Sequence, residues 1–178
     1  MKLIVTLFLL FSSLFPLEHS TDKIGWSESE RLSWADFQGR PTKGAGYVAS
    51  TSSGISFSYS YKLKDEEVTY NYTVESFFYP KESWYKPELV SAYILDHEQT
   101  HFDISELHSR LLRKMISEAS FSKNIKKEIE ALYQEVEKQR RIMQDRFDLE
   151  TEHSKISEKE IQWETFIATQ LKAYERWK

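Results

Sequence analysis

The sequence predicts an α+β fold in which an N-terminal antiparallel β-hairpin or small sheet is followed by three helices. Between residues 55 and 74, apolar and polar residues alternate in two runs, which is the period of a half-buried strand. From residue 87 onward, apolar residues recur every three or four positions, which is the period of an amphipathic helix. No internal repeat interrupts this order, and strands followed by helices indicate the α+β class.

The strand region follows an aromatic, turn-rich segment at residues 24–46. The first strand is expected at residues 55–63, where one parity holds Ile55, Phe57, Tyr59, Tyr61 and Leu63. The second is expected at residues 68–74, where one parity holds Val68, Tyr70, Tyr72 and Val74. Polar residues 64–67 separate the two runs, so we expect an antiparallel pair joined by a turn.

Three helices are expected in the second half of the chain. The first runs from Pro87, a residue suited to the first position of a helix, to about residue 118. The second runs from about residue 123 to 147, and residues 148–156 form a polar link. Ser157 and Glu160 have the spacing of a capping box that begins the last helix. The expected inward face of that helix holds Trp163, Ile167, Tyr174 and Trp177.

The first twenty residues have the pattern of a secretory signal peptide. A basic start at Lys2 precedes an apolar stretch of roughly 15 residues, shorter than the 20 or so that a bilayer span needs. We therefore expect residues 1–20 to be a signal peptide and residues 21–178 to be a single exported domain, periplasmic or secreted. An uncleaved N-terminal anchor is the alternative. No later segment has the character of a membrane span.

Composition limits the chemistry that this domain can carry. The 178 residues include no cysteine, which excludes disulfides, thiol nucleophiles and Cys-ligated metal sites. The net charge is −4 and Lys and Arg form no block, which argues against a nucleic-acid partner. Any metal site must therefore be built from His, Asp and Glu.

The segment that carries chemistry is the HExxH motif at residues 97–101. On a helix, His97 and His101 lie one above the other and can both ligate one Zn²⁺. Glu98 can reach a water at that ion without being a ligand, and can act as general base. The pair belongs to a stripe that should face the core: Ile94, His97, His101, Ile104, His108, Leu111 and Met115. Two core histidines satisfied by hydrogen bonds are the alternative.

A catalytic zinc ion normally has three protein ligands and one open position, so a third ligand is required. His108 is about 10.5 Å along the helix from His101, too far to share an ion with the pair. We therefore assign His153, in the polar link, as the third zinc ligand. A solvated loop histidine is the alternative, in which case a nearby carboxylate could take its place: Asp148, Glu150 or Glu152.

Several motifs resemble one bacterial family, the domain of unknown function 922. Residues 34–41, WADFQGRP, resemble its W-x-D-F-x-G-x-P opening, and Ser83-Trp84 is similar to its S-W element. Residues 97–107, HEQTHFDISEL, resemble its H-E-Q-x-H-F-D-I-x-E-L core, and Arg110 fits the arginine that follows. Residues 147–154, FDLETEHS, look like its Y-D-x-E-T-x-H-G element, with Phe147 in place of Tyr and Ser154 in place of Gly.

The resemblance implies a zincin-like, zinc-dependent protease exported from a bacterial cell. It also supports His153, because that histidine recurs in the late motif of the family. The lost Gly at Ser154 could alter the backbone beside His153, and the lost hydroxyl at Phe147 could remove a hydrogen bond near the metal.

We therefore expect an exported zinc metallopeptidase in which Glu98 is the general base and the substrate is a peptide or protein of the cell envelope. An edge of the predicted hairpin could bind an extended peptide by strand addition. Two rivals remain. One is a non-catalytic envelope protein that uses zinc to join helices, with a closed fourth position. The other is a metal-dependent hydrolase of cell-wall amides. The sequence does not set the oligomeric state or the cleavage preference.

Overall fold

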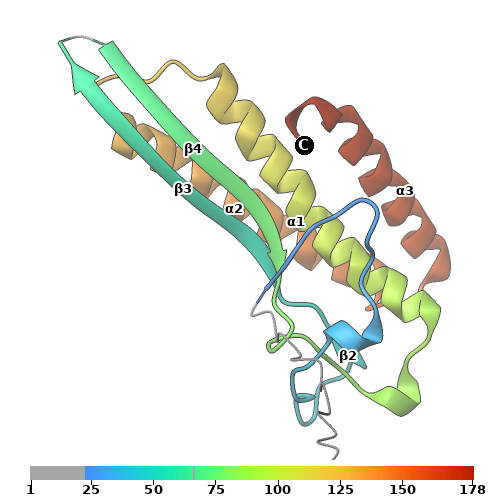
Figure 1. Ribbon diagram of the computed structural model, residues 1–178. Coiled ribbons are helices and arrows are strands. Elements are labelled where there is room, and N and C mark those ends of the chain that lie inside the picture. Colours follow the sequence, from blue (N-terminus) through green and yellow to red (C-terminus); the bar gives the residue numbers. More distant parts are fainter. Residues whose placement is uncertain (1–22, 66) are drawn as a thin grey trace, which may run out of the picture.

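The computed structural model describes residues 23–178 except residue 66, and it has the predicted α+β architecture (Figure 1). The predicted signal peptide lies outside the described residues. The strands are β1 (Ile24–Gly25), β2 (Ala49–Ser50), β3 (Ser53–Lys64), β4 (Glu67–Phe78) and β5 (Trp84–Tyr85). The long helices are α1 (Ala92–Glu118), α2 (Ile125–Thr151) and α3 (Ser157–Ala173), and the 3-10 helices are η1 (Trp34–Asp36), η2 (Pro87–Leu89) and η3 (Glu175–Trp177). Within this described part, no helix has the length and apolar character needed to cross a membrane.

Strands β3 and β4 form the long antiparallel hairpin that the alternation predicts. Their register runs from Ser53 opposite Phe78 to Lys64 opposite Glu67, so each strand extends past its predicted ends. The apolar parity forms cross-strand pairs on one face, such as Phe57 with Val74 and Tyr59 with Tyr72. Strand β1 adds to the β4 edge, and β2 and β5 form a separate two-stranded sheet.

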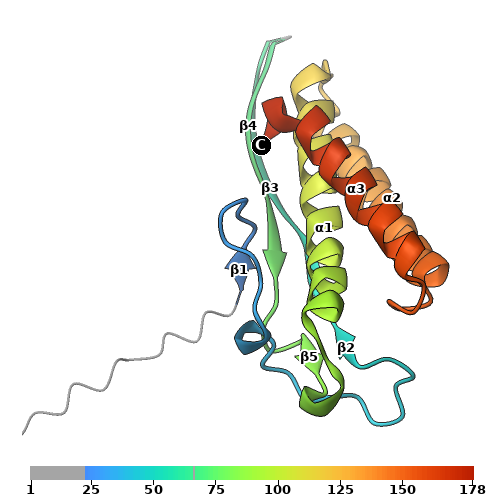
Figure 2. The same cartoon turned by 90° about the vertical axis from the view of Figure 1, so that its right-hand side faces the viewer.

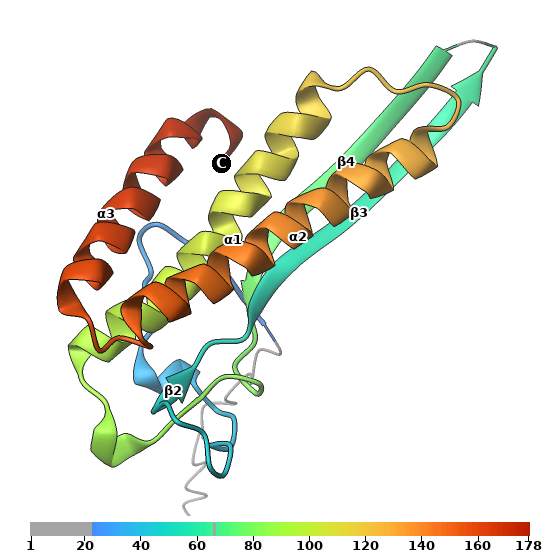
Figure 3. The ribbon, with the colours of Figure 1, turned by 180° about the vertical axis from the view of Figure 1, so that it is seen from behind.

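The apolar face of the hairpin packs against α1 and α2, while α3 packs against α1 and α2 beyond the hairpin (Figures 2 and 3). The buried centre of this contact consists of Ile55, Val74, Leu112, Ile116, Ile125, Ile129 and Val136. A second cluster joins the three helices near the middle of α1: Ile104, Leu107, Phe147, Trp163 and Ile167. Each helix therefore buries one apolar stripe, as its periodicity predicts.

Between His97 and Arg110, α1 is buried on most of its faces and not only on its apolar stripe. Glu106 and Arg110, whose i,i+4 spacing is typical of an exposed pair, are 3% and 1% exposed. Their side chains are joined at 2.9 Å, and the hydroxyl of Ser76 donates to Glu106 at 2.6 Å. The pair is buried because β4 and the C-terminal segment cover this part of the helix, where Arg110 also donates to the carbonyl of Leu171.

The N-terminal segment, residues 24–37, is fastened to α1 by side chains of the motif helix. The Trp26 indole donates to Asp103 at 2.7 Å, and the backbone N–H of Leu32 donates to Gln99 at 2.8 Å. Gln99 itself donates to Asp103 at 2.8 Å. These contacts use the face of α1 that points away from α2, so one helical turn presents different chemistry to its two sides.

Several details at the helix ends differ from the sequence-based expectation. Helix α1 begins at Ala92 and not at Pro87, because Pro87–Leu89 form the separate 3-10 helix η2. Helix α2 continues to Thr151, so Asp148 and Glu150 belong to its last turn and not to a polar link. The expected capping box is also absent, because Ser157 is already helical and Ile156 is the N-cap of α3. The Glu160 carboxylate, which the box would direct to the N-cap, contacts His97 instead.

Candidate metal centre

Helix α1 brings the two histidines of the motif together in the interior. His97 and His101 are one turn apart and largely buried, and their Nε2 atoms are 3.2 Å from each other. The helix begins after Ser91, whose hydroxyl accepts the backbone N–H of Ile94 at 3.4 Å. This cap fixes the start of α1 one turn before the ligand pair.

Asp148 reaches the same point from the last turn of α2. Its Oδ1 atom is 3.3 Å from Nε2 of His97 and 3.1 Å from Nε2 of His101. Among residues 23–65 and 67–178, these three side chains form the one group that could hold a metal ion. They are brought together because α2 packs antiparallel to α1 with its C-terminal end beside the motif (Figure 3).

The spacing of the three atoms fits a zinc ion. Ligands at about 2.0–2.1 Å from a tetrahedral ion are about 3.3 Å from one another. The three separations here are 3.1, 3.2 and 3.3 Å. Three protein ligands are also the number that catalytic zinc sites use, with one position left for water or substrate.

Hydrogen bonds on the far side of each ring fix which nitrogen faces the cluster. Nδ1 of His97 is 2.9 Å from the Glu160 carboxylate, and Nδ1 of His101 contacts Oε1 of Gln144. The Gln144 amide is oriented by its nitrogen, which donates to the carbonyl of His101 at 2.8 Å. Both Nδ1 atoms are therefore donors, and in neutral rings both Nε2 lone pairs face the Asp148 carboxylate. Three acceptors facing one another, two of them on largely buried rings, are unfavourable unless a cation lies between them.

The electrostatics of the cluster favour positive charge. Burial lowers the pKa of His97, but hydrogen bonds to Asp148 and Glu160 outweigh it and raise this pKa to about 9. Burial raises the pKa of Asp148, but hydrogen bonds to His101 and His97 outweigh it and hold this pKa well below its ordinary value. The residues therefore attract either a proton or a metal ion to this point.

Glu98 follows the first histidine and is buried next to the cluster. Its Oε2 atom has no hydrogen-bond partner within the described part of the chain. Burial raises its pKa, against the opposing charges of His101 and His97. The hydroxyl of Thr51 donates to the Glu98 carbonyl at 3.1 Å, which ties this turn of α1 to the segment after β2. A carboxylate with a free oxygen and a raised pKa suits proton transfer.

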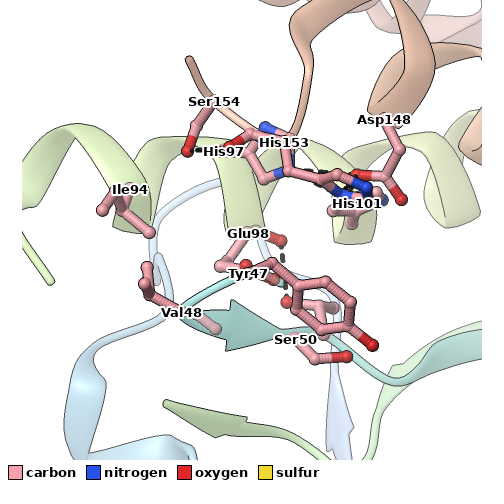
Figure 4. A pocket seen from close by; sticks show the side chains of 12 residues that line it. Tyr47, Val48, Ser50, Ile94, His97, Glu98, His101, Asp148, His153 and Ser154 are labelled. Atoms are coloured by element: carbon pink, nitrogen blue, oxygen red, sulfur yellow. Dashed lines mark hydrogen bonds and ion pairs between the residues drawn. The ribbon is translucent and has the colours of Figure 1, made fainter. Parts of the chain in front are cut away.

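A pocket of about 170 Å³ opens beside these groups (Figure 4). Its walls come from α1 and the end of α2 on one side and from the β2 segment on the other. The lining residues are Tyr47, Val48, Ala49, Ser50, Thr51, Ile94, His97, Glu98, His101, Asp148, His153 and Ser154. The candidate ligands and Glu98 therefore face a common space in which a substrate could lie.

His153, which the sequence analysis assigns as the third ligand, lies at the rim of this pocket. Its side chain is 45% exposed, its ring stacks on Tyr47 at 5.3 Å, and its Nδ1 is 3.1 Å from Oδ1 of Asp148. It lies outside the group formed by His97, His101 and Asp148. The structure thus brings His97, His101 and His153 to the same oxygen atom of Asp148.

The backbone at His153 is left-handed over three successive residues. Glu152, His153 and Ser154 have φ angles of 49°, 52° and 63°. Such angles are unfavourable for residues with a Cβ atom, and glycine adopts them without that penalty. Ser154 therefore has a backbone conformation that glycine would adopt with less strain.

The remaining sequence candidates lie elsewhere. Glu150 accepts hydrogen bonds from Arg146 at 2.6 Å and from the Trp163 indole at 2.9 Å, and Glu152 is exposed. His108 is buried, and its Nδ1 donates to the carbonyl of Ile104 at 2.8 Å. It is not part of the group that could hold a metal ion, as expected from its distance along the helix from His101. Glu160 and Gln144 were not among the sequence candidates.

A comparison with protein families gives one match. The model of a family described as "Bacterial protein of unknown function (DUF922)" matches residues 28–154. The match includes the motif helix, Asp148 and His153, and it ends before α3 and Glu160. No curated protein and no solved structure matches the chain.

Proposed function

The chain belongs to the DUF922 family of bacterial proteins, and we propose that it is a zinc-dependent hydrolase, specifically a metallopeptidase exported from the cell. One observation carries the proposal: two imidazoles and a carboxylate have the spacing of zinc ligands next to a buried carboxylate that lacks a partner. Export is proposed from the character of residues 1–20.

We propose His97, His101 and Asp148 as the zinc ligands. His153 supports this set through Asp148, whose Oδ1 is 3.1 Å from its Nδ1. A zinc ion held by these residues would lower the pKa of a water molecule and polarise a carbonyl group of the substrate. Because the three ligands leave a position toward the pocket, this arrangement favours catalysis over a purely structural metal site.

Glu98 would move the proton. Its free Oε2 and raised pKa let it accept a proton from the attacking water and return it to the leaving amine. The Thr51 hydroxyl donates to the backbone carbonyl of Glu98, which holds this turn of α1 against the wall of the pocket. This division of roles requires Glu98 for turnover but not for metal binding.

The wall formed by residues 47–51 supports a peptide substrate. Strand β2 pairs with β5, and the Lys86 N–H donates to the Val48 carbonyl at 2.8 Å. Antiparallel ladders bond alternate residues to one partner, so the backbone groups of Ala49 point away from β5. A free edge of this kind binds an extended peptide by strand addition. We assign this role to β2, which lines the pocket, in place of the hairpin edge expected from the sequence.

The replacement Glu98→Gln tests the proposal. We expect zinc content equal to that of the wild type and a fall in peptide hydrolysis of at least about 100-fold, the lower end of what a general base contributes. The exposed Glu118, at the far end of the same helix, supplies the control variant Glu118→Gln. Peptide libraries and cell-wall fragments assayed in parallel separate a peptidase from a wall-amide hydrolase. Undiminished hydrolysis by Glu98→Gln would contradict the mechanism, and zinc binding without any turnover would favour the structural role.

A further inference from the structure

Glu160 is a fully buried carboxylate that α3 contributes to the metal centre. It lies in the first turn of the helix, where its backbone N–H donates to the carbonyl of Ile156 at 3.1 Å. Its side chain is 0% exposed. Oε1 is 2.9 Å from Nδ1 of His97, and Oε2 has no hydrogen-bond partner among the described residues. Burying a carboxylate with one oxygen that lacks a hydrogen-bond partner lowers the stability of the fold, so we expect Glu160 to have a role that compensates for this loss.

Among the groups around His97, Glu160 determines which nitrogen of the ring faces Asp148. One face of His97 stacks on Phe147 at 4.5 Å between ring centroids, and Phe147 in turn packs against Trp163 of α3. These apolar contacts fix the plane of the ring but do not choose which nitrogen faces Asp148. The Glu160 carboxylate makes that choice, because it accepts only from a protonated Nδ1.

The ring of His101 is oriented in the same way, but by a neutral group. Its Nδ1 contacts the amide oxygen of Gln144, one turn before Asp148 on α2. The two ligands therefore differ in the charge of the group behind them, an anion for His97 and an amide for His101. An anionic acceptor makes an imidazole the stronger metal ligand.

We propose that Glu160 is a positioning residue for the metal ion, and that α3 is thereby part of the metal site. Glu160 holds the His97 ring with Nε2 toward the ion and offsets the positive charge of the ion from behind that ring. Gln144 orients His101 without contributing charge. The inference rests on the metal-binding part of the proposed function and not on hydrolysis. It concerns a helix beyond the region matched by the family model, which ends at residue 154.

The test measures zinc affinity by competition with a chelator in Glu160→Leu, Glu160→Gln and the control Glu158→Gln. Glu158 lies in the same turn of α3 but is exposed. Loss of a residue that supports a metal ligand weakens affinity by about 10–100-fold. We expect Glu160→Leu near the upper end of this range, Glu160→Gln near the lower end because the amide oxygen can still accept from Nδ1, and the control unchanged.

Thermal unfolding with and without zinc separates positioning from a general effect on folding. We expect the metal-free Glu160→Leu protein to unfold earlier than the metal-free wild type, because Nδ1 of His97 loses its buried acceptor. Positioning is therefore measured by the stabilisation that zinc adds to each protein, which should be smaller for Glu160→Leu than for the wild type. Should Glu160→Leu fail to fold, Glu160→Gln decides the question.

Wild-type zinc affinity in Glu160→Gln and in any folded Glu160→Leu would overturn the proposal. A wild-type protein that binds zinc but cleaves nothing leaves it intact and removes only the proposed hydrolase activity. A wild-type protein that binds no zinc removes both.

Discussion

The two halves of α1 lie in the same helix but in different interiors. From His97 to Arg110, most side chains are buried whatever face they occupy, and most of the buried ones are polar. From Leu111 to Glu118, the buried residues are Leu112 and Ile116, which pack against the hairpin and α2 in the usual amphipathic manner. The first half therefore depends on partners for its polar groups, and the second half on apolar area.

The difference teaches where stability and function are separated in this molecule. Several polar groups of the first half are bonded to another element, as Gln99 is to Leu32 and Ser105 to Ser53. Such groups specify geometry but contribute little net stability. The apolar half supplies the contacts that hold the helices on the hairpin. Substitutions in the two halves should therefore have distinct signatures.

The largest expected effect lies in the apolar half, with Ile116→Ala. Ile116 is fully buried, and its truncation should lower the free energy of unfolding by about 2–5 kcal/mol through lost burial and a residual cavity. Denaturant titration measures the loss, with the exposed Glu118→Ala as control. Zinc affinity of the folded variant should equal that of the wild type. A loss below about 1 kcal/mol, or a change in zinc affinity, would break the distinction between the two halves.

The next effect lies at the metal end and distinguishes Asp148 from His153. Asp148→Ala removes the proposed third ligand and should weaken zinc binding by more than about 100-fold, beyond the usual effect of losing a group that only supports a ligand. His153→Ala should weaken it by about 10-fold or less, because His153 acts through Asp148.

Chelator competition on both variants gives the answer, and each serves as the control for the other. The reverse order of effects would support His153 as the third ligand, as the sequence analysis predicts. Equal large losses would indicate four protein ligands and a structural metal, contrary to the proposed activity.

The smallest effect concerns strain at the metal end, with Ser154→Gly. Glycine relieves the left-handed conformation at φ 63°, although its freer unfolded chain offsets part of the gain, so we expect about 0.5 kcal/mol of stabilisation. Ser157→Gly, in the regular first turn of α3, should instead destabilise by about 0.5–1 kcal/mol. Thermal unfolding of the pair measures both. Destabilisation by Ser154→Gly would mean that the Ser154 hydroxyl, which donates to the carbonyl of His153, outweighs the backbone strain.

Elements with a clear period could be predicted from the sequence, and their ends could not. The parity of residues 55–63 and 68–74 predicts the hairpin because one face of it packs on the helices. The end of α2 was placed too early because its last turn is polar and looks like a solvated link. In the structure, Asp148 contacts His97 and His101. Glu150 accepts hydrogen bonds from Arg146 and Trp163. The burial of Glu106 and Arg110 could not be predicted either, because opposite charges at i,i+4 are typical of an exposed helix face.

For the site, the motif placed His97, Glu98 and His101 on one helix, and the structure gathers them at one pocket. The third candidate could not be chosen by residue type alone, because the choice between Asp148 and His153 depends on how α2 packs against α1. Glu160 carried a signal that was given to the wrong partner: a Ser–Glu spacing typical of a capping box conceals a carboxylate that turns inward to His97. One further sequence signal was the spacing of Gln144 and Asp148, which are four residues apart and therefore share one face of α2.

The fastening of residues 24–37 to the motif helix has a practical consequence for shortened versions of the chain. Trp26 and Leu32 satisfy Asp103 and Gln99, which stand on the same turn of α1 as the two histidines. A version that starts after Leu32 would leave an amide and a carboxylate without these donors, next to the two histidines of the candidate metal centre. Expression boundaries should therefore be drawn upstream of Trp26, even though the recognisable motif begins more than seventy residues later.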